Sequence, residues 1–281
     1  MSNQFRLNAQ ERKIVGLAAL GGMLEFYDFI IYGMFSVYFA HQFFPSNNQL
    51  LSIIESYVVF VLGYLSRPIG GMLFSHIGDE HGRKKVLVIT IILMGISSLG
   101  IGLLPTYQQI GVIAPIGLVV FRLLQGLALG GELPSTYVYI SESMPNKRGS
   151  GFGITMVGVN SGLLLGSLIN QLLNFAFTPA ELTSYGWRIP FILGGVICLI
   201  SYKIRQTLHE TAAFQRIEDK PEFPLGFLFK HHLPQMIAGI ATTAIMSGLV
   251  VVAIIFMPTY LHNILKVENR TISLIMTFAM L

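Results

Sequence analysis

Charged residues are scarce in this sequence of 281 residues: Asp, Glu, Lys and Arg make up 11% of it, against 53% hydrophobic residues. Soluble domains are about a quarter charged, because their surfaces face water. Soluble and disordered classes are therefore excluded. Long apolar stretches recur from Ile14 to Leu281, and each can cross about 30 Å of hydrocarbon at about 1.5 Å per residue. The sequence predicts an all-α polytopic membrane protein.

Cysteine is nearly absent as well, since Cys198 is the only one. A single cysteine forms no internal disulfide, which excludes a disulfide-stapled fold. His76 and His81 lie close together in sequence, but no set of three or four clustered ligands accompanies them. The sequence also has no G-x-S-x-G, G-x-x-x-x-G-K-[ST] or H-E-x-x-H motif. We therefore expect no enzyme, no metal and no cofactor.

Basic residues are confined to alternate loops. Segments 41–50 and 105–111 contain no Lys or Arg, and the exceptions are Arg188, Lys266 and Arg270. The positive-inside rule then predicts an N-terminus in the cytoplasm. We expect an integral protein of the plasma (inner) membrane, with the lipid bilayer and no nucleic acid as partner. The basic groups are Arg6, Arg12 and Lys13; Arg83, Lys84 and Lys85; Lys147 and Arg148; and Lys203, Arg205, Arg216, Lys220 and Lys230.

The hydropathy pattern predicts seven spans and the start of an eighth. The predicted spans are 14–40, 51–77, 86–104, 112–140, 150–175, 189–203 and 236–260, with the last one beginning near Thr271. The domains expected are a six-helix bundle over 1–203, a cytoplasmic linker over 204–233 and the start of a second bundle over 234–281. Because Thr271–Leu281 gives only about 16 Å of helix, we expect a C-terminally truncated fragment. A short amphipathic helix is expected over Thr207–Ile217.

Five charges fall at membrane depth, where each costs at least about 2.5 kcal/mol, or on the order of 15 kcal/mol together. Helix rise places Glu25, Asp28, Arg67 and Glu132 about 15 to 21 Å from the cytoplasmic edge and Arg122 somewhat higher. Glu25, Asp28 and Tyr32 share one helix face, and Arg122 and Gln125 share another with Glu132 beside it. Either these residues line an aqueous cavity, or they are buried ion pairs that only fix helix register.

The segment Gly78-Asp79-Glu80-His81-Gly82-Arg83-Lys84-Lys85 resembles the loop between spans two and three of the major facilitator superfamily, with Ser75 and Glu80 as departures. The resemblance implies a major facilitator fold, in which six spans, a linker and a second bundle follow one another. It also implies a cytoplasmic gate in which the aspartate and arginine pair with each other and with an acidic residue that ends span four. The gate residues implied here are Asp79, Gly82, Arg83, Glu142 and Arg148.

Several further segments resemble the metabolite:proton symporters, a group with proline/betaine, α-ketoglutarate, citrate and shikimate transporters. The segments are Gly22–Phe29, Ser66–Gly71, Arg122–Gly126 with Gly130–Glu132, Glu142 with Pro145 and Arg148-Gly149, Gly186–Phe191, and Glu210-Thr211 with Phe214. The likeness implies proton-coupled symport of a small organic solute by alternating access, most similar to the proline/betaine type, and twelve spans in a full-length member.

A buried carboxylate suits proton coupling because desolvation favours its neutral form, while a nearby arginine favours its charged form. Our hypothesis is that Asp28 or Glu132 carries the proton, while Arg67 or Arg122 meets a substrate carboxylate or, in the empty state, the counter-charge. The candidate cavity residues are Glu25, Asp28, Tyr32, Arg67, Arg122, Gln125 and Glu132. The alternative is a non-transporting remnant or a half-transporter that needs a separately encoded C-terminal half, since alternating access needs two bundles.

Overall fold

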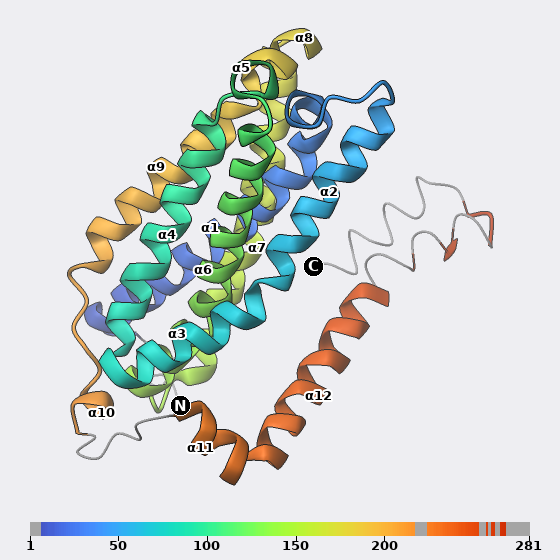
Figure 1. Cartoon of the computed structure of the whole chain (residues 1–281). Coiled ribbons are helices and arrows are strands. Elements are labelled where there is room, and N and C mark those ends of the chain that lie inside the picture. Colours follow the sequence, from blue (N-terminus) through green and yellow to red (C-terminus); the bar gives the residue numbers. More distant parts are fainter. Residues whose placement is uncertain (1–6, 217–223, 253–256, 258–259, 262–264, 268–281) are drawn as a thin grey trace. The chain divides into compact units, whose positions relative to one another are not determined.

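The structure is a computed structural model that describes residues 7–216, 224–252, 257, 260–261 and 265–267. The chain divides into two compact units, Met1–Lys220 and Pro221–Leu281, so the first unit ends inside the linker predicted over 204–233. All regular elements of the described residues are helices (Figure 1). The first unit holds α1 (Ala9–Phe43), α2 (Gln49–Leu65), α3 (Arg67–His81), α4 (Arg83–Leu103), α5 (Tyr107–Ile110), α6 (Ile113–Ser143), α7 (Arg148–Ala176), α8 (Pro179–Glu181), the π-helix η1 (Leu182–Gly186), α9 (Arg188–Arg205) and α10 (Ala212–Gln215).

Five helical stretches of the described residues are long and apolar enough to cross a membrane, and a sixth is the pair α8–η1 and α9, bent by 45°. They correspond to the first six predicted spans, with α2 and α3 together forming the second. The sixth prediction, 189–203, matches α9 alone, and the segment Pro179–Gly186 of the bent pair precedes it. Consecutive spans run in opposite directions (Figure 1). We name the two ends of this bundle by residues that lie there: the Gly82 end, where α1 begins and α3 meets α4, and the Trp187 end.

The second span is broken at Ser66, between α2 and α3. Pro68 lies in the first turn of α3, where its missing N–H costs no helical hydrogen bond. The Ser66 hydroxyl donates to the carbonyls of Gly63 (2.8 Å) and, across the bundle, Leu123 of α6 (3.1 Å). The break therefore sets the direction of α3 and positions Arg67 at its first residue.

Glycine seams bring helices of the bundle into backbone contact. A Cβ on Gly158 or Gly162 of α7 would collide with the main chain of Ala19 or Met23 of α1, and one on Gly126 of α6 with the carbonyl of Gly63. Because only glycine fits at such distances, α7 packs directly on α1, and α6 directly on α2. The residues named in the predicted cavity are thereby held on neighbouring backbones.

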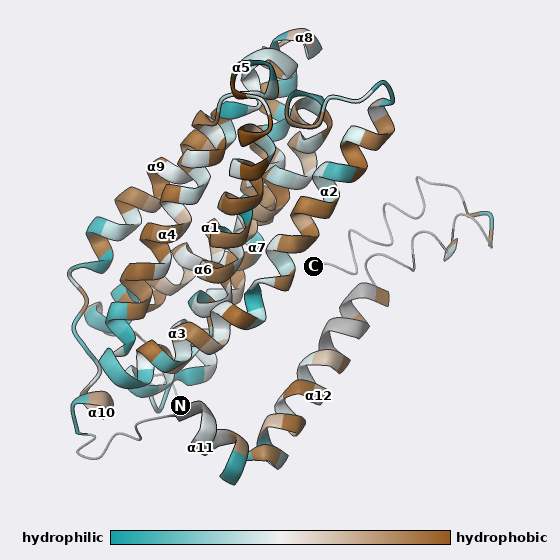
Figure 2. Ribbon diagram, viewed as in Figure 1, coloured by the Kyte–Doolittle hydropathy of each residue, from teal (hydrophilic) through white to brown (hydrophobic). Residues whose placement is uncertain are grey.

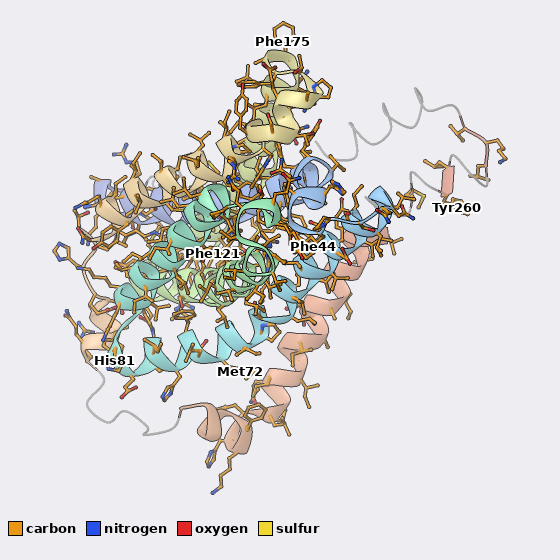
Figure 3. All side chains as sticks on the ribbon, turned by 45° about the horizontal axis from the view of Figure 1, so that its top comes forward. Phe44, Met72, His81, Phe121, Phe175 and Tyr260 are labelled. Atoms are coloured by element: carbon orange, nitrogen blue, oxygen red, sulfur yellow. The ribbon has the colours of Figure 1, made fainter. Side chains whose placement is uncertain are left out.

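The Trp187 end contains an aromatic core. Trp187 packs against Phe39, Phe43 and Phe191, and all four side chains are fully buried. Many large apolar side chains of α2 and α9 are exposed. Figure 2 colours much of the ribbon of both helices as hydrophobic, and Phe175 projects from the end of α7 (Figure 3). An apolar outer surface is what a membrane-spanning bundle requires, and the few buried charges are turned inward.

The helices α11 (Pro224–His231) and α12 (Leu233–Val251) belong to the second unit. The apolar helix α12 coincides with the first part of the span predicted over 236–260, and the remainder lies partly outside the described residues. The expected start of an eighth span near Thr271 lies wholly outside them. The amphipathic helix expected over Thr207–Ile217 is wrong in extent, because the described residues form only the single turn of α10.

Candidate functional site

Glu25 of α1 pairs with Arg67 at the start of α3. Arg67 Nη1 lies 3.5 Å from Glu25 Oε1, and the guanidinium lies over the ring of Tyr64, 4.3 Å from its centroid. The Arg67 side chain is 25% exposed, whereas that of Glu25 is 3% exposed and its Oε2 has no hydrogen-bond partner among the described residues. Arg67 is thus the more accessible half of a loose ion pair, and a ligand could reach it from outside the bundle.

Asp28, one turn further along α1, is bound by uncharged groups. The Ser98 hydroxyl of α4 donates to Asp28 Oδ2 at 2.5 Å, and Gln125 Nε2 of α6 donates to Ser98 Oγ at 2.9 Å and to Asp28 Oδ2 at 3.4 Å. Asp28 is 2% exposed, and its Oδ1 is buried with no hydrogen-bond partner among the described residues. A buried carboxylate oxygen without a donor is a position where a proton can be held.

Arg122 of α6 is buried between aromatic rings. Its guanidinium lies 4.0 Å from the ring centroid of Tyr32 and 5.0 Å from that of Phe60, and its Nη1 donates to Gln125 Oε1 at 2.7 Å. The Tyr32 hydroxyl in turn donates to the carbonyl of Ser56 at 3.1 Å. Within the described chain, Arg122 forms no ion pair with a carboxylate, and Gln125 links it to Asp28.

Glu132 of α6 is bound by Arg205, the last residue of α9. Arg205 donates from Nη2 to Glu132 Oε1 at 2.6 Å and from Nη1 to Oε2 at 3.0 Å, and the Thr90 hydroxyl of α4 donates to Oε2 at 2.5 Å. The other donors of Arg205 reach the carbonyls of Leu87 (2.8 Å) and Leu17 (3.4 Å). Both charged side chains are 2% exposed.

This pair corrects one interpretation of the sequence. Arg205 was counted among the basic residues of a cytoplasmic loop, whereas it is buried inside the bundle and contacts α1, α4 and α6. Its position could have been recognised, because Cys198, Ser201 and Arg205 fall on one face of α9 and all three are buried. Glu132 consequently has no free carboxylate oxygen, unlike Glu25 and Asp28.

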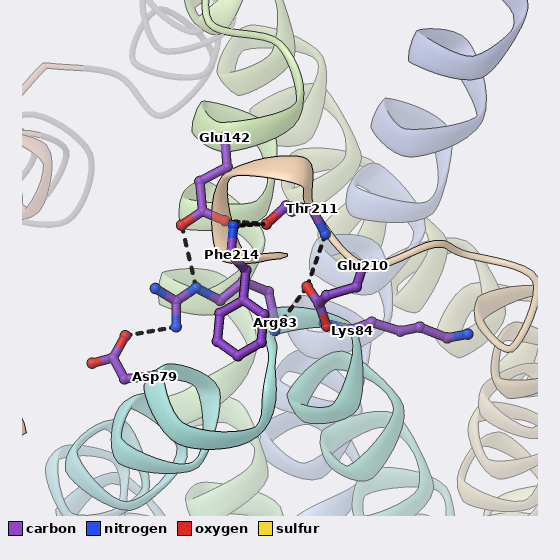
Figure 4. A network of polar contacts seen from close by, with 7 residues as sticks. All are labelled: Asp79, Arg83, Lys84, Glu142, Glu210, Thr211 and Phe214. Carbon is purple, nitrogen blue, oxygen red and sulfur yellow. Dashed lines mark hydrogen bonds and ion pairs between the residues drawn. The ribbon is translucent and has the colours of Figure 1, made fainter. Parts of the chain in front are cut away.

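The Gly82 end carries a second polar network (Figure 4). Arg83 Nη1 lies 2.6 Å from Asp79 Oδ1, and Arg83 Nε lies 3.3 Å from Glu142 Oε1. The Thr211 hydroxyl donates to Glu142 Oε2 at 2.5 Å. Gly82 has φ of +106°, a conformation that favours glycine, and this residue joins α3 to α4. Two of the predicted gate side chains, Asp79 and Glu142, therefore bind the guanidinium of a third, Arg83.

The residues after α9 complete this network, and the sequence interpretation left them out of the gate. Glu210 accepts hydrogen bonds from the backbone N–H groups of Arg83 and Lys84, both at 3.1 Å, and so caps the N-terminus of α4. Phe214 is buried, and its ring centroid lies 5.5 Å from the Arg83 guanidinium. The signal available for both residues was the Glu210-Thr211 and Phe214 segment, which is part of the resemblance to the metabolite:proton symporters.

Arg148 lies apart from these contacts. Its Nε donates to the carbonyl of Ser141 at 3.2 Å, and among the described hydrogen bonds and ion pairs it has none with Asp79, Arg83 or Glu142. Of the predicted cavity residues, Arg67, Arg122 and Gln125 line one narrow pocket together with Tyr64. Across the residues that the structure covers, no group of three or more His, Cys, Asp and Glu side chains could hold a metal ion.

The geometry defines a polar core inside an apolar helix bundle, and sequence comparison assigns its family. Residues 18–281 match the Major Facilitator Superfamily, so the chain belongs to that family. A putative proline/betaine transporter of Staphylococcus aureus (strain COL) is 34% identical over 275 residues, covering 96% of this chain and 59% of that protein. The alpha-ketoglutarate permease of Escherichia coli (strain K12) is 41% identical over 200 residues, covering 71% of this chain and 46% of that protein.

A solved structure shares the fold. The proton:xylose symporter XylE of E. coli superimposes with a TM-score of 0.67 at 22% identity, over 80% of this chain and 50% of that one. The all-α polytopic fold and the major facilitator architecture expected from the sequence are confirmed. The relatives are transporters, which confirms the expectation that this is not an enzyme. The chain spans 59% of the length of the staphylococcal relative.

Proposed function

We propose that this chain forms the first bundle of a secondary active transporter that couples a small organic solute to protons by alternating access. The observation that carries the proposal is Asp28, a fully buried carboxylate that has one unpartnered oxygen and no ion pair among the described residues. Such a group can bind and release a proton as its surroundings change, which a saturated ion pair cannot. The relatives named as proline/betaine transporter and alpha-ketoglutarate permease support a solute with a carboxylate.

Roles for the other candidate residues follow from their contacts. Arg67, partly exposed and loosely paired with Glu25, is proposed to meet the solute carboxylate, and Arg122 to balance the charge of Asp28. Tyr32 holds Arg122 by its ring face. Glu132 is proposed to be structural, since Arg205 and Thr90 occupy both of its oxygens. This favours Asp28 over Glu132 as the proton carrier.

We place the Gly82 end in the cytoplasm of a plasma (inner) membrane, with the N-terminus on that side. The placement is supported by the basic residues at this end, among them Arg83, Lys84 and Lys147. The network of Asp79, Arg83 and Glu142, built on the Gly82 turn, then acts as a cytoplasmic gate. The domain arrangement proposed is the bundle over 1–203, the linker over 204–233 and the start of a second bundle over 234–281.

The test is uptake of radiolabelled betaine, proline and a dicarboxylate into liposomes that contain the chain and carry an imposed pH gradient. The wild-type chain is expected to accumulate one of these solutes, and Asp28→Asn to lose most of this accumulation, because an asparagine amide cannot carry the proton that couples the gradient to the solute. Glu55→Gln is the matched control, because it neutralises another carboxylate in a membrane helix, one that has no hydrogen bond or ion pair with Asp28 among the described contacts. Full proton-driven accumulation by Asp28→Asn would contradict the proposal.

A second candidate function is a half-transporter that acts only with a separately supplied second half. It is favoured by the coverage of the relatives, since the chain spans 59% of the staphylococcal protein. The same liposomes should be prepared with and without the second half of that relative as a separate chain. Uptake that appears only with both chains would support this candidate, and uptake by the chain alone would exclude it.

A further inference from the structure

Among the described residues, three buried carboxylates, Glu25, Asp28 and Glu132, lie near three arginines, Arg67, Arg122 and Arg205, but only two direct ion pairs connect them. Glu25 pairs with Arg67 and Glu132 pairs with Arg205, whereas Asp28 and Arg122 have no direct pair within the described residues. The side chain of Gln125 lies between these last two. This residue belongs to none of the ion pairs, yet it contacts both remaining charges.

The amide of Gln125 presents a different chemical group to each neighbour. Its carbonyl Oε1 accepts from Arg122 Nη1 at 2.7 Å, while its Nε2 donates to Ser98 Oγ at 2.9 Å and to Asp28 Oδ2 at 3.4 Å. The reversed orientation would direct amide hydrogens at a guanidinium, which only donates, and a carbonyl at a carboxylate, which only accepts. The charges on either side therefore fix the direction of the amide.

Arg122 depends on this one amide for its direction. Gln125 Oε1 is the sole hydrogen-bond acceptor of the Arg122 side chain in the described contacts, and Arg122 Nε is buried without a partner. The faces of Tyr32 and Phe60 hold the guanidinium, but ring faces fix a cation far less precisely in direction than a carbonyl does. Any change at the amide thus reaches Arg122.

We propose that Gln125 is a positioning residue that transmits the protonation state of Asp28 to Arg122. When Asp28 is charged, it attracts the Nε2 donor and polarises the amide, which strengthens the bond from Arg122 to Oε1. When Asp28 holds a proton, that attraction is lost and the hold on Arg122 weakens. The inference rests on the proposed function in one respect, namely that Asp28 binds the coupled proton.

Several other groups also act on Asp28 and must be kept constant. α4 contributes Ser98, which does not titrate, and α7 has no titratable side chain after Arg148. The packed elements carry many titratable or charged side chains, among them Tyr27, Glu25 and Tyr32 on α1, Glu55, Tyr57 and Tyr64 on α2, Arg67 on α3, Arg122 and Glu132 on α6, and Cys198 and Arg205 on α9. None of these is altered except Arg122 in the test below.

The test is a double-mutant cycle on the 281-residue chain in lipid nanodiscs. The protonation of Asp28 is followed by the infrared C=O band of its carboxylic acid, assigned by its absence in Asp28→Asn. Arg122→Gln should shift the midpoint of this titration by about one pH unit, because a nearby positive charge is removed. In a Gln125→Met background, the same change at Arg122 should shift the midpoint by less than half as much.

If Gln125 had a purely structural role, or if Arg122 acted on Asp28 through space alone, Arg122→Gln would shift the midpoint equally in the wild-type and Gln125→Met backgrounds. An equal shift would overturn the proposal. Gln171→Met on the exposed side of α7 is the matched control and should leave the full shift. Gln125→Asn, one methylene shorter, is the second variant in case Gln125→Met does not fold, and it should also reduce the shift. Unfolding of both Gln125 variants would mark the residue as structural and contradict the proposal.

The cycle and the uptake assay can fail separately. Coupling through Gln125 without solute uptake would uphold this inference and count against the proposed function of the chain. Suppose instead that uptake requires Asp28 and that Arg122→Gln shifts the titration of Asp28 equally with and without Gln125→Met. That result would support the proposed function and overturn this inference. An Asp28 that never takes up a proton in the titration would overturn the inference directly.

Discussion

Glu132 and Asp28 are carboxylates in the core of the same bundle, and they differ in their partners. Glu132 has both oxygens bound by Arg205 and one also by Thr90. Asp28 has one oxygen bound by Ser98 and Gln125, and the other has no partner among the described residues. Burial alone therefore does not separate a structural carboxylate from one suited to titrate. The number and charge of its partners do.

The largest effect is expected from breaking the Glu132 pair. Glu132→Met leaves Arg205 as a buried charge without its partner and should lower the free energy of unfolding by about 3–5 kcal/mol. The double variant Glu132→Met with Arg205→Met should recover most of this loss. Thermal denaturation in detergent provides the measurement.

Asp28→Asn is the comparison for that experiment. It keeps a side-chain oxygen for Ser98 and breaks no direct ion pair among the described residues, so it should change the free energy of unfolding by about 1 kcal/mol or less. An equal loss from Asp28→Asn and Glu132→Met would contradict the distinction between the two carboxylates.

Substitutions at two glycines, one beside each carboxylate, should change the free energy of unfolding by intermediate amounts. A Cβ on Gly21 would collide with Arg205 Nη2 and Glu132 Oε1, while a Cβ on Gly194 would lie 2.9 Å from Asp28 Oδ1. Gly21→Ala should cost about 1–3 kcal/mol because it displaces two paired charges. Gly194→Ala should cost less, because Oδ1 has no hydrogen bond to lose. The same melting assay compares them.

Gly16→Ala is the control on α1, since nothing lies within 4 Å of its added Cβ. It should be neutral or stabilise by up to about 1 kcal/mol, because alanine favours a helix over glycine. If Gly21→Ala behaved like this control, the Glu132 pair would not be rigidly held.

The smallest effect is expected for a pair near the surface. Lys147 Nζ lies 2.8 Å from Glu11 Oε2, with side chains 22% and 17% exposed. Lys147→Met should cost less than about 1 kcal/mol, since water already stabilises both separated charges. The difference from wild type should shrink further at high salt, which screens a pair of this kind and leaves the Glu132 pair unaffected. A cost near that of Glu132→Met would show that burial does not control these energies.

The spans could be predicted from the sequence because apolar length is a local property, and the first six agree with α1 to α9. The deep charges Glu25, Asp28, Arg67, Arg122 and Glu132 were recognisable for the same reason. Their partners were not, because pairing joins residues far apart in the chain, such as Glu132 and Arg205, 73 positions apart. The hydropathy pattern ended the sixth span at Lys203, two residues before Arg205, whose side chain is buried inside the bundle.

Uncharged partners were harder still to predict. Thr90 and Ser98 lie eight residues apart on one face of α4 within an apolar run, and serine and threonine are common in membrane helices without any special role. Gln125 was predicted to face the cavity with Arg122, but its bridging position between Arg122 and Asp28 follows only from the packing of α1 on α6. Sequence patterns select the polar groups, and packing decides which of them meet.

The contact of Glu210 with α4 has a consequence for sequence drift at the Gly82 end. The carboxylate binds backbone N–H groups of positions 83 and 84, not their side chains. Position 84 can therefore mutate to any residue except proline and still be capped, whereas position 210 needs an acceptor of the same reach. Neutral substitutions should accumulate at position 84 while position 210 stays fixed. Position 84 tolerates substitution because it takes part in this contact through its backbone, whereas position 210 takes part through its side chain.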